Sequence, residues 1–400
     1  MSSGPSVLNL EPQARAARAS RAGIVSLVLL SLGHFCVDLY SGALGAFQPV
    51  LVDRLGLSLT QAGILGGAFV FSSSVTQPVY GILSDRFRTS LIAGLAPAAA
   101  GLFISTLGLA PGYTWLLALV MLGGAGVAAF HPQASSRATA GVPGNRGRLM
   151  AIFISSGTLG MAVGPTYFSA LLTRLGPART SWGALPGVLA TVLLVALLPA
   201  AAPSIARAES AFDWKALRSV RRPLTILFFL VFIRSIVQVT FAQLLPLYLH
   251  LVRGHSVTGA SLTLSLYLTF GAVGGFAGGH LSDRFGGRTV ILISMISCVP
   301  FLALFFLTRG ALSLLGLLLG GLTLLFTVPV NVVMAQELVP SQAGTVSALM
   351  MGFAWGTAGV IFIPLTGWAS DHFGMQAALS ALTLFPLIGF FLTLKLPKGL

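Results

Sequence analysis

The sequence predicts an all-α membrane protein with twelve transmembrane helices arranged as two pseudo-symmetric six-helix bundles. The 400 residues are 55% apolar and only 8% charged, whereas soluble domains average about 25% charged residues. Apolar runs of roughly 20 residues, enough to span a bilayer, recur along the chain. The segment over residues 81–87 also returns 198 positions later as residues 279–285, with only Ile82 replaced by His280. An internal repeat in so apolar a chain indicates two related membrane-embedded halves.

The first half is expected to contain a cytoplasmic tail and six spans. The tail, residues 1–22, is polar and carries Arg15, Arg18 and Arg21, and we expect it to be unstructured. The apolar run that follows is too long for the core of a signal peptide. The spans of this half are predicted over residues 23–50, 60–83, 90–109, 113–136, 147–173 and 182–201, which gives an amino-terminal bundle over 23–202.

Residues 203–222 form the longest polar interval between spans, and we expect them to be a cytoplasmic linker. A carboxy-terminal bundle then occupies residues 223–400. Its spans are predicted over residues 223–250, 258–281, 289–308, 311–336, 343–368 and 375–396. Ser58 and Ser256 repeat at the same offset as the seven-residue segment, which supports a duplication of six spans.

Lysine and arginine are distributed unevenly between the two sets of loops. With the amino terminus inside the cell, 17 of them fall in the tail, the inner loops and the carboxy terminus, and five fall in the outer loops. Cytoplasmic loops carry this excess in membrane proteins. The charge pattern therefore predicts that both termini and both copies of the repeated segment are cytoplasmic.

Several classes of function are disfavoured. The net charge of +14 comes from basic residues in short turns, so no nucleic-acid partner is expected. Cys36 and Cys298 lie inside apolar runs without metal-ligand spacing. No phosphate-binding loop, metal motif or nucleophile motif is present, so we expect no cofactor, no metal and no enzymatic activity.

Twelve predicted spans, a central polar loop and Gly-x-x-x-Asp-Arg-Phe after spans two and eight resemble the major facilitator superfamily. Residues 31–40, 73–78 and 130–137 are similar to the fosmidomycin-resistance branch of that superfamily, although Gln133 stands where the branch often has glutamate. The resemblance implies alternating access around a central site, with members acting as proton-driven exporters of small drugs.

Asp38 is the only acidic residue predicted well inside a span, roughly 22 Å along the first helix at 1.5 Å per residue. A carboxylate at that depth is costly, which favours a proton-binding role over a purely structural one. Arg234 is the only deep lysine or arginine, at a similar predicted depth in the seventh helix. We expect it to pair with Asp38, either permanently or as a partner that exchanges with an anionic substrate.

His34 precedes Asp38 by one helical turn, so its imidazole could tune the carboxylate. The resemblance implies that helices 1, 4, 7 and 10 line the transport path. Substrate-binding candidates are therefore Arg234, His131, Gln133, Tyr40, Gln238, Gln243 and Asn331. Each of these side chains could instead serve packing or a hydrogen bond between helices.

The repeated segments are predicted to form gates. Asp85 and Asp283 could accept hydrogen bonds at a nearby helix amino terminus, where the helix dipole is positive. Arg86 and Arg284 would bridge to the opposite half. The gating set comprises Gly81, Asp85, Arg86, Gly279, Asp283, Arg284, Arg288 and the possible latch partner Glu337. Glycine rows in helices 5, 8 and 11 permit close backbone approach, and the resemblance implies that they lie between the halves.

These observations predict a monomeric, proton-coupled exporter of small drugs or organic anions in a bacterial inner membrane, whose partners are substrate, protons and lipid. A facilitator or proton symporter for a small organic anion is the alternative within transport. A non-transporting membrane receptor is the alternative from another class, and the short outer loops disfavour it.

Overall fold

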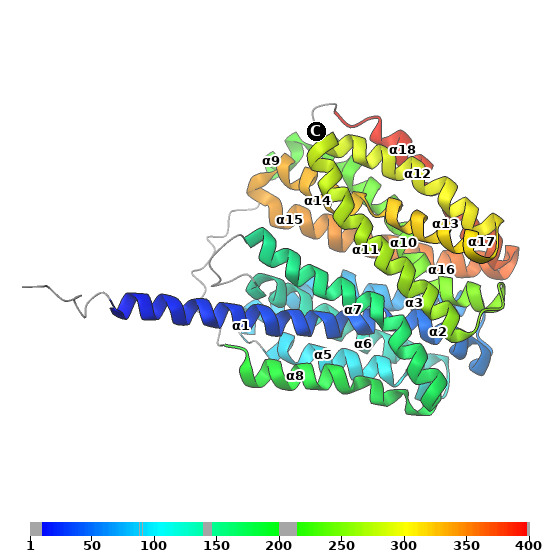
Figure 1. Cartoon of the computed structure of the whole chain (residues 1–400), viewed down its shortest axis with the longest axis horizontal. Coiled ribbons are helices and arrows are strands. Elements are labelled where there is room, and N and C mark those ends of the chain that lie inside the picture. Colours follow the sequence, from blue (N-terminus) through cyan, green and yellow to red (C-terminus); the bar gives the residue numbers. More distant parts are fainter. Residues whose placement is uncertain (1–9, 88, 90, 139–145, 200–213, 398–400) are drawn as a thin grey trace, which may run out of the picture.

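The computed structural model describes residues 10–87, 89, 91–138, 146–199 and 214–397, and these residues are helical with short connections. Figure 1 shows the helices running roughly parallel, with α1 and α5–α8 in its lower part and α10–α18 in its upper part. Within the described residues, eleven helical segments are long and apolar enough to cross a membrane. The all-helical, multi-span architecture predicted from the sequence is therefore confirmed.

The first half places its helices close to the predicted ranges. Its elements are α1 (Leu10–Ser41), α2 (Ala43–Leu55), α3 (Leu59–Val70), η2 (Phe71–Val75), α4 (Gln77–Phe87), α5 (Leu91–Ser105), η3 (Leu107–Leu109), α6 (Tyr113–Ala138), α7 (Arg146–Leu175), η4 (Pro177–Ala184) and α8 (Leu185–Leu197). The span predicted over 60–83 consists of α3, the π-helical turn η2 and α4, and a turn at Thr76 interrupts it. This segment is not among the eleven.

The expected tail differs from the structure, because α1 begins at Leu10 rather than near residue 23. The added stretch is rich in alanine and arginine, which are good helix formers. In Figure 1 this part of α1 projects beyond the other helices.

The second half starts with a short helix, α9 (Trp214–Ser219), inside the predicted linker, of which residues 203–213 lie outside the described part of the chain. Its remaining elements are α10 (Arg221–Leu251), α11 (Val257–Phe285), α12 (Gly287–Leu307), α13 (Gly310–Leu324), α14 (Thr327–Leu338), η5 (Pro340–Gln342), α15 (Ala343–Ala348), η6 (Leu349–Ala354), α16 (Trp355–Phe373), α17 (Met375–Leu382) and α18 (Phe385–Thr393).

The largest contacts between the halves are those of α3 with α16, α7 with α11, and α2 with α10. We call the end of the molecule where α4 and α11 end, at Phe87 and Phe285, the hinge face. The end where α2 and α10 end, at Leu55 and Leu251, is the far face.

The glycine rows are only partly where they were expected. In α16, a Cβ atom on Gly367 would clash with the carbonyl oxygen of Leu59 in α3, so this row does allow the halves to approach. In α7, a Cβ atom on Gly160 would meet the backbone of Phe35 in α1 of its own half. The glycines of α11 likewise face α13 and its carboxy-terminal connection, so the rows in helices 5 and 8 tighten each half internally.

Candidate functional site: a buried histidine–aspartate–histidine cluster

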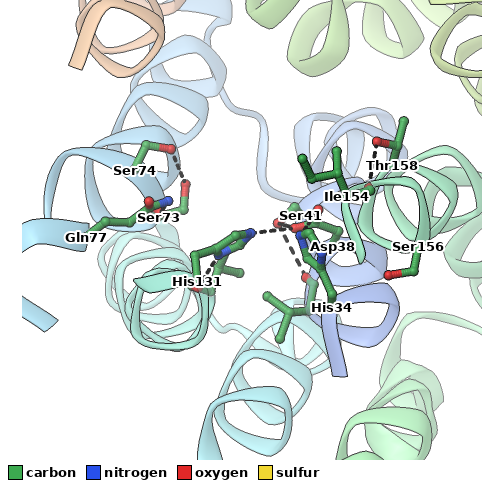
Figure 2. A network of polar contacts seen from close by, with 12 residues as sticks. His34, Asp38, Ser41, Ser73, Ser74, Gln77, His131, Ile154, Ser156 and Thr158 are labelled. Carbon is green, nitrogen blue, oxygen red and sulfur yellow. Dashed lines mark hydrogen bonds and ion pairs between the residues drawn. The ribbon is translucent and has the colours of Figure 1, made fainter. Parts of the chain in front are cut away.

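Two helices of the first half bring His34, Asp38 and His131 together. His34 and Asp38 lie one turn apart on α1, so their side chains share a face of the helix. His131 comes from α6, beside Pro132. The Nε2 atom of His34 lies 3.3 Å from Asp38 Oδ2, and the Nε2 atom of His131 lies 3.5 Å from Asp38 Oδ1. Figure 2 shows the two imidazoles pointing at the same carboxylate.

Each imidazole is held by its other ring nitrogen. His34 Nδ1 lies 2.8 Å from the carbonyl oxygen of Phe153, and His131 Nδ1 lies 2.9 Å from the carbonyl oxygen of Val127. A carbonyl oxygen can only accept, so both Nδ1 atoms carry the hydrogen and donate it. The ring of His34 also stacks on that of Phe153, with centroids 4.3 Å apart. Both Nε2 atoms are therefore aimed at Asp38 by fixed rings.

This arrangement needs positive charge between the rings and the carboxylate, supplied by protons or by a metal ion, since one ligand atom from each of the three residues lies within 4.8 Å of the others. Protons act as follows. With Nδ1 protonated, a neutral imidazole presents a lone pair at Nε2, and a carboxylate presents lone pairs as well. Each contact becomes attractive only when a proton lies on the nitrogen or on the carboxyl oxygen. One added proton satisfies one contact and makes the cluster neutral, and a second satisfies both. The cluster can thus hold one or two exchangeable protons in a buried position.

A glycine of α7 makes room for the cluster. A Cβ atom on Gly157 would clash with His34 Nε2 and lie only 2.6 Å from Asp38 Oδ2. The hydroxyl group of Ser41 lies 3.4 Å from Asp38 Oδ1 and adds a weak hydrogen bond. Three helices therefore meet at the carboxylate.

The expected ion pair between Asp38 and Arg234 is absent. Of the ion pairs among the described residues, none includes Arg234, and Asp38 pairs with the two histidines of its own half. The prediction was wrong because equal depth on α1 and α10 does not place two side chains against each other. The imidazoles of His34 on α1 and His131 on α6 lie against the carboxylate of Asp38 in place of Arg234.

Arg234 instead forms the centre of a second polar region in the other half. It is 5% exposed and its Nη1 atom donates a hydrogen bond to Gln238 Oε1. Its Nε atom has no hydrogen-bond partner among the described residues. A buried guanidinium with a free donor and no acid within ion-pair distance is costly unless an anion reaches it.

Other buried polar atoms of this half also lack partners within the described ranges. These are Gln243 Oε1, both amide atoms of Asn331 and the hydroxyl group of Tyr267. Gln243 and Asn331 were predicted from the sequence, whereas Tyr267 was not. Tyr267 lies on α11, within the electrostatic reach of Arg234. Its sequence neighbourhood is apolar and rich in glycine, which gives no signal for a polar site.

Two of the predicted substrate-binding residues, Tyr40 and Gln133, form hydrogen bonds to the protein backbone. Tyr40 is fully buried, donates to the carbonyl oxygen of Gly183 at 3.1 Å and accepts from Gly187 N at 2.8 Å, so it ties α1 to the η4–α8 segment. Gln133 lies toward the hinge face and donates from Nε2 to the carbonyl oxygen of Thr89 at 2.7 Å, although its Oε1 atom is free. Tyr40 has no group left for a ligand.

The predicted inner gate is not engaged. Arg86, Asp283, Arg284 and Glu337 are exposed, and none of them forms an ion pair in the described part of the chain. Arg284 lies over the ring of its neighbour Phe285, 5.8 Å from the centroid. A Cβ atom added at Gly81 would lie 3.6 Å from Pro132, and one added at Gly279 would lie 3.7 Å from Pro329. Arg288 donates to the carbonyl oxygen of Leu394 at 3.2 Å, and the side chain of Asp85 lies outside the described residues.

Comparison with known proteins places this architecture. The family model of the Major Facilitator Superfamily matches residues 30–364. The chain is 31% identical over 372 residues to the uncharacterized MFS-type transporter YfnC of Bacillus subtilis, covering 91% of this chain and 90% of that protein. It is 29% identical over 409 residues to the fosmidomycin resistance protein of Escherichia coli, covering 97% of each.

Solved structures share the fold at low sequence identity. A bacterial homolog of the human lysosomal transporter Spinster, in an inward-facing and occupied conformation, matches with a TM-score of 0.81 at 16% identity, covering 92% of this chain and 95% of that chain. A point mutant of the nucleoside transporter NupG matches with a TM-score of 0.79 at 14% identity, covering 94% and 100%. The chain is a multi-pass membrane protein and belongs to the major facilitator superfamily of secondary transporters, which are not enzymes.

Proposed function

We propose that this transporter exports small drugs or organic anions in exchange for protons, by alternating access of one central cavity. In this proposal the cluster of His34, Asp38 and His131 is the proton site, and Arg234 is the anion site. The single observation that carries the proposal is the meeting of two fixed imidazoles at one buried carboxylate, because that geometry forms a buried site for exchangeable protons.

The proton site differs from the one expected from the sequence. Asp38 keeps its predicted role and His34 its tuning role, while His131 moves from the substrate set to the proton set. A cluster that alternates between one and two protons changes its net charge from neutral to positive. A buried positive charge repels a guanidinium and cationic ligands, so a proton and a cationic drug would compete, as antiport requires. The same charge attracts anions, which for an anionic substrate favours the symport alternative.

The anion site is supported by the free Nε donor of Arg234 and by the free hydroxyl group of Tyr267. Arginine presents its donors in a fork that fits carboxylate and phosphate-like groups. Gln238 orients one arm of the fork and leaves Nε available. A buried arginine with an unpaired hydrogen-bond donor destabilises the protein, so a ligand that binds this donor explains its presence better than a structural role does.

The two sites have a physical connection through the interface between the halves. Gly157 of α7 touches the cluster, and Thr166 of the same helix lies 2.7 Å from the hydroxyl group of Ser265 in α11. Tyr267 follows Ser265 by two residues. A shift of α7 on proton binding would therefore be transmitted to the helix that carries Tyr267, which replaces the direct ion-pair exchange expected from the sequence.

Relatives narrow the substrates worth testing. Besides the fosmidomycin resistance protein, the chain resembles a hexuronate transporter of B. subtilis, at 26% identity, and a probable sulfoacetate transporter of Cupriavidus necator, at 24% identity. Sulfoacetate and hexuronates are anions at neutral pH, which suits Arg234. These two relatives favour the alternative of an organic-anion symporter, and the direction of proton movement separates the two.

We also propose that the protein acts as a monomer in the bacterial inner membrane, with the hinge face and both termini in the cytoplasm. The excess of basic residues at that face supports this orientation. The proposed bundles, residues 23–202 and 223–400, are supported by the packing of α1 against α5–α8 and of α10 against α11, α16 and α18.

The test is transport in liposomes that contain a pH-sensitive dye, with fosmidomycin, sulfoacetate and galacturonate as separate probes. Antiport predicts that entry of a probe drives protons out, and that Asp38→Asn abolishes this proton flux. Proton movement in the same direction as the probe would support symport. Binding of a probe without counterflow of labelled probe would support a receptor and refute transport.

A further inference from the structure

The hinge motif occurs a third time, at the opposite end of the molecule. Residues 84–87 read Ser-Asp-Arg-Phe, residues 282–286 read Ser-Asp-Arg-Phe-Gly, and residues 370–374 read Ser-Asp-His-Phe-Gly. The first two copies end α4 and α11 at the hinge face. The third ends α16 at the far face, beside the start of α3.

The second and third copies share their backbone geometry. Gly286 has φ 81° and ψ 146°, and Gly374 has φ 84° and ψ 145°, a region that essentially only glycine adopts. Each glycine N–H donates to the carbonyl oxygen of the serine of its own motif, at 2.9 Å for Ser282 and 3.1 Å for Ser370. In both copies the glycine also begins the next helix. The third copy is thus the same structural unit placed at the other end of the molecule.

Asp371 of the third copy accepts hydrogen bonds from the other half of the protein. Its Oδ1 atom accepts from Leu59 N at 2.9 Å, and its Oδ2 atom accepts from Thr60 N at 2.8 Å and from Thr60 Oγ1 at 2.5 Å. These two N–H groups belong to the first turn of α3, which has no intrahelical partners for them. A carboxylate there also opposes the positive end of the helix dipole.

The corresponding acid at the hinge face makes no such contact. Asp283 is exposed and forms no ion pair among the described residues. Of the two motif acids whose side chains the structure describes, only the one at the far face bridges the halves. We propose that Asp371 is a positioning residue for transport, the latch that keeps the far face closed while the hinge face is free. This role is independent of the proton and anion sites.

The two helices that Asp371 connects, α16 and α3, pack closely beside it. Gly367, one turn before Asp371, packs against Leu59 and Gly63 of α3, so the helices touch through their backbones. A second contact between the halves lies at the same face, where His250 Nε2 is 3.1 Å from Asp53 Oδ2. Asp53 is 56% exposed in its side chain, so this pair contributes little. Asp371 is exposed as well, but it accepts three hydrogen bonds from α3, whereas Asp53 has one partner, so Asp371 makes most of the polar contacts between the halves at this face.

The experiment measures access to a cysteine placed behind the latch. Gln243 is 5% exposed and lies across the interface, 3.4 Å from a Cβ atom built on Gly66 of α3. Gln243→Cys is made with Cys36 and Cys298 replaced by serine, and its reaction with a maleimide is timed in detergent. Asp371→Asn should raise the labelling rate roughly tenfold, because it removes the negative charge and one of the two oxygen atoms that accept hydrogen bonds from the start of α3.

Matched variants separate a latch from a general loss of packing. Thr60→Val removes one of the three hydrogen bonds and should raise labelling about threefold, whereas Thr60→Ser keeps the hydroxyl group and should label at the parental rate. Asp53→Asn removes the same charge from the same face and should raise labelling less than about twofold. Asp283→Asn should not raise it.

An unchanged labelling rate in Asp371→Asn overturns the proposal, and so does an equal increase in Asp53→Asn. Thermal unfolding of each variant is recorded in parallel. If Asp371→Asn does not fold, the contrast between Thr60→Val and Thr60→Ser decides, and equal rates for those two variants count against the latch.

Discussion

A single methyl group added at Gly157 tests whether the three-residue cluster is one unit. A Cβ atom there would clash with His34 Nε2 and lie only 2.5 Å from His34 Cε1. The imidazole cannot simply turn away, because its Nδ1 is bonded to the carbonyl oxygen of Phe153 and its face is stacked on the Phe153 ring. Gly157→Ala must therefore displace either α7 or the imidazole.

The size of the effect follows from two opposing contributions. Overpacking a tight site costs up to about 3 kcal/mol, while replacing glycine by alanine inside a helix returns about 1 kcal/mol. We expect Gly157→Ala to lower the free energy of unfolding by about 2 kcal/mol. If the helices stay in place and only the imidazole of His34 is displaced, the same free energy lowers the population of protein with an assembled cluster roughly thirtyfold.

The assay combines chemical denaturation with NMR of labelled histidine. In the parent protein the ring protons of His34 and His131 should show cross-relaxation, because the two ring centroids lie 5.0 Å apart. In Gly157→Ala this cross-peak should weaken, because the imidazole of His34 is displaced. Gly160→Ala is the matched control, since its Cβ atom would clash with the backbone oxygen of Phe35 without touching the cluster. It should destabilise the protein and leave the cross-peak intact.

The reasoning would be refuted by a Gly157→Ala protein of parental stability that keeps the cross-peak between the two histidine rings. A loss of the cross-peak in Gly160→Ala of the same size would also refute it, because the effect would then report helix packing in general.

Three further outcomes are expected. Asp38→Asn should abolish probe-driven proton flux in liposomes while counterflow of labelled probe continues, because the carboxylate is the group that the two imidazoles share; flux at the parental level would exclude the cluster as the proton site. Arg234→Gln should weaken binding of an anionic probe at least about thirtyfold, as loss of a buried charge partner does, and a thermal-shift titration with sulfoacetate measures this, with parental affinity contradicting the anion site. Tyr40→Phe should lower the free energy of unfolding by about 1–2 kcal/mol through the loss of its buried hydrogen bonds and leave probe affinity unchanged, whereas lost affinity would return Tyr40 to the substrate site.

Features that depend on order along the chain were predictable. Apolar runs indicated most of the helices within a few residues, because hydrophobic length is a local signal, although the polar start of α1 at Leu10 was missed. The division into two halves, which the repeat over residues 81–87 and 279–285 predicts, stays a prediction. The unusual positions of Asp38 and Arg234 were also recognisable, since isolated charges in apolar runs are rare.

Features that depend on which way a helix face points were not predictable. Asp38 was matched with Arg234 by depth, but helix rotation decides contacts, and it turned Asp38 toward His131. Tyr40 was a candidate because the resemblance implies that the first helix lines the path, but its hydroxyl group is bound to the η4–α8 segment, which the sequence does not show. The third Ser-Asp-x-Phe-Gly unit was visible in the sequence. Its contact with the start of α3 could be recognised only in the structure.

The two π-helical turns give the moving halves a particular mechanical property. η2 (Phe71–Val75) and η6 (Leu349–Ala354) face each other across the interface, each midway along an otherwise α-helical span. A π-turn accommodates one residue more than an α-turn, so relaxing it rotates everything downstream by about 100°. We expect α4 and α15 to rotate about these points independently of α3 and α16, so that the hinge-face ends of these two spans can move without moving their far-face ends. Amide hydrogens of η2 and η6 that exchange no faster than those of α3 and α16 would show that whole spans tilt instead.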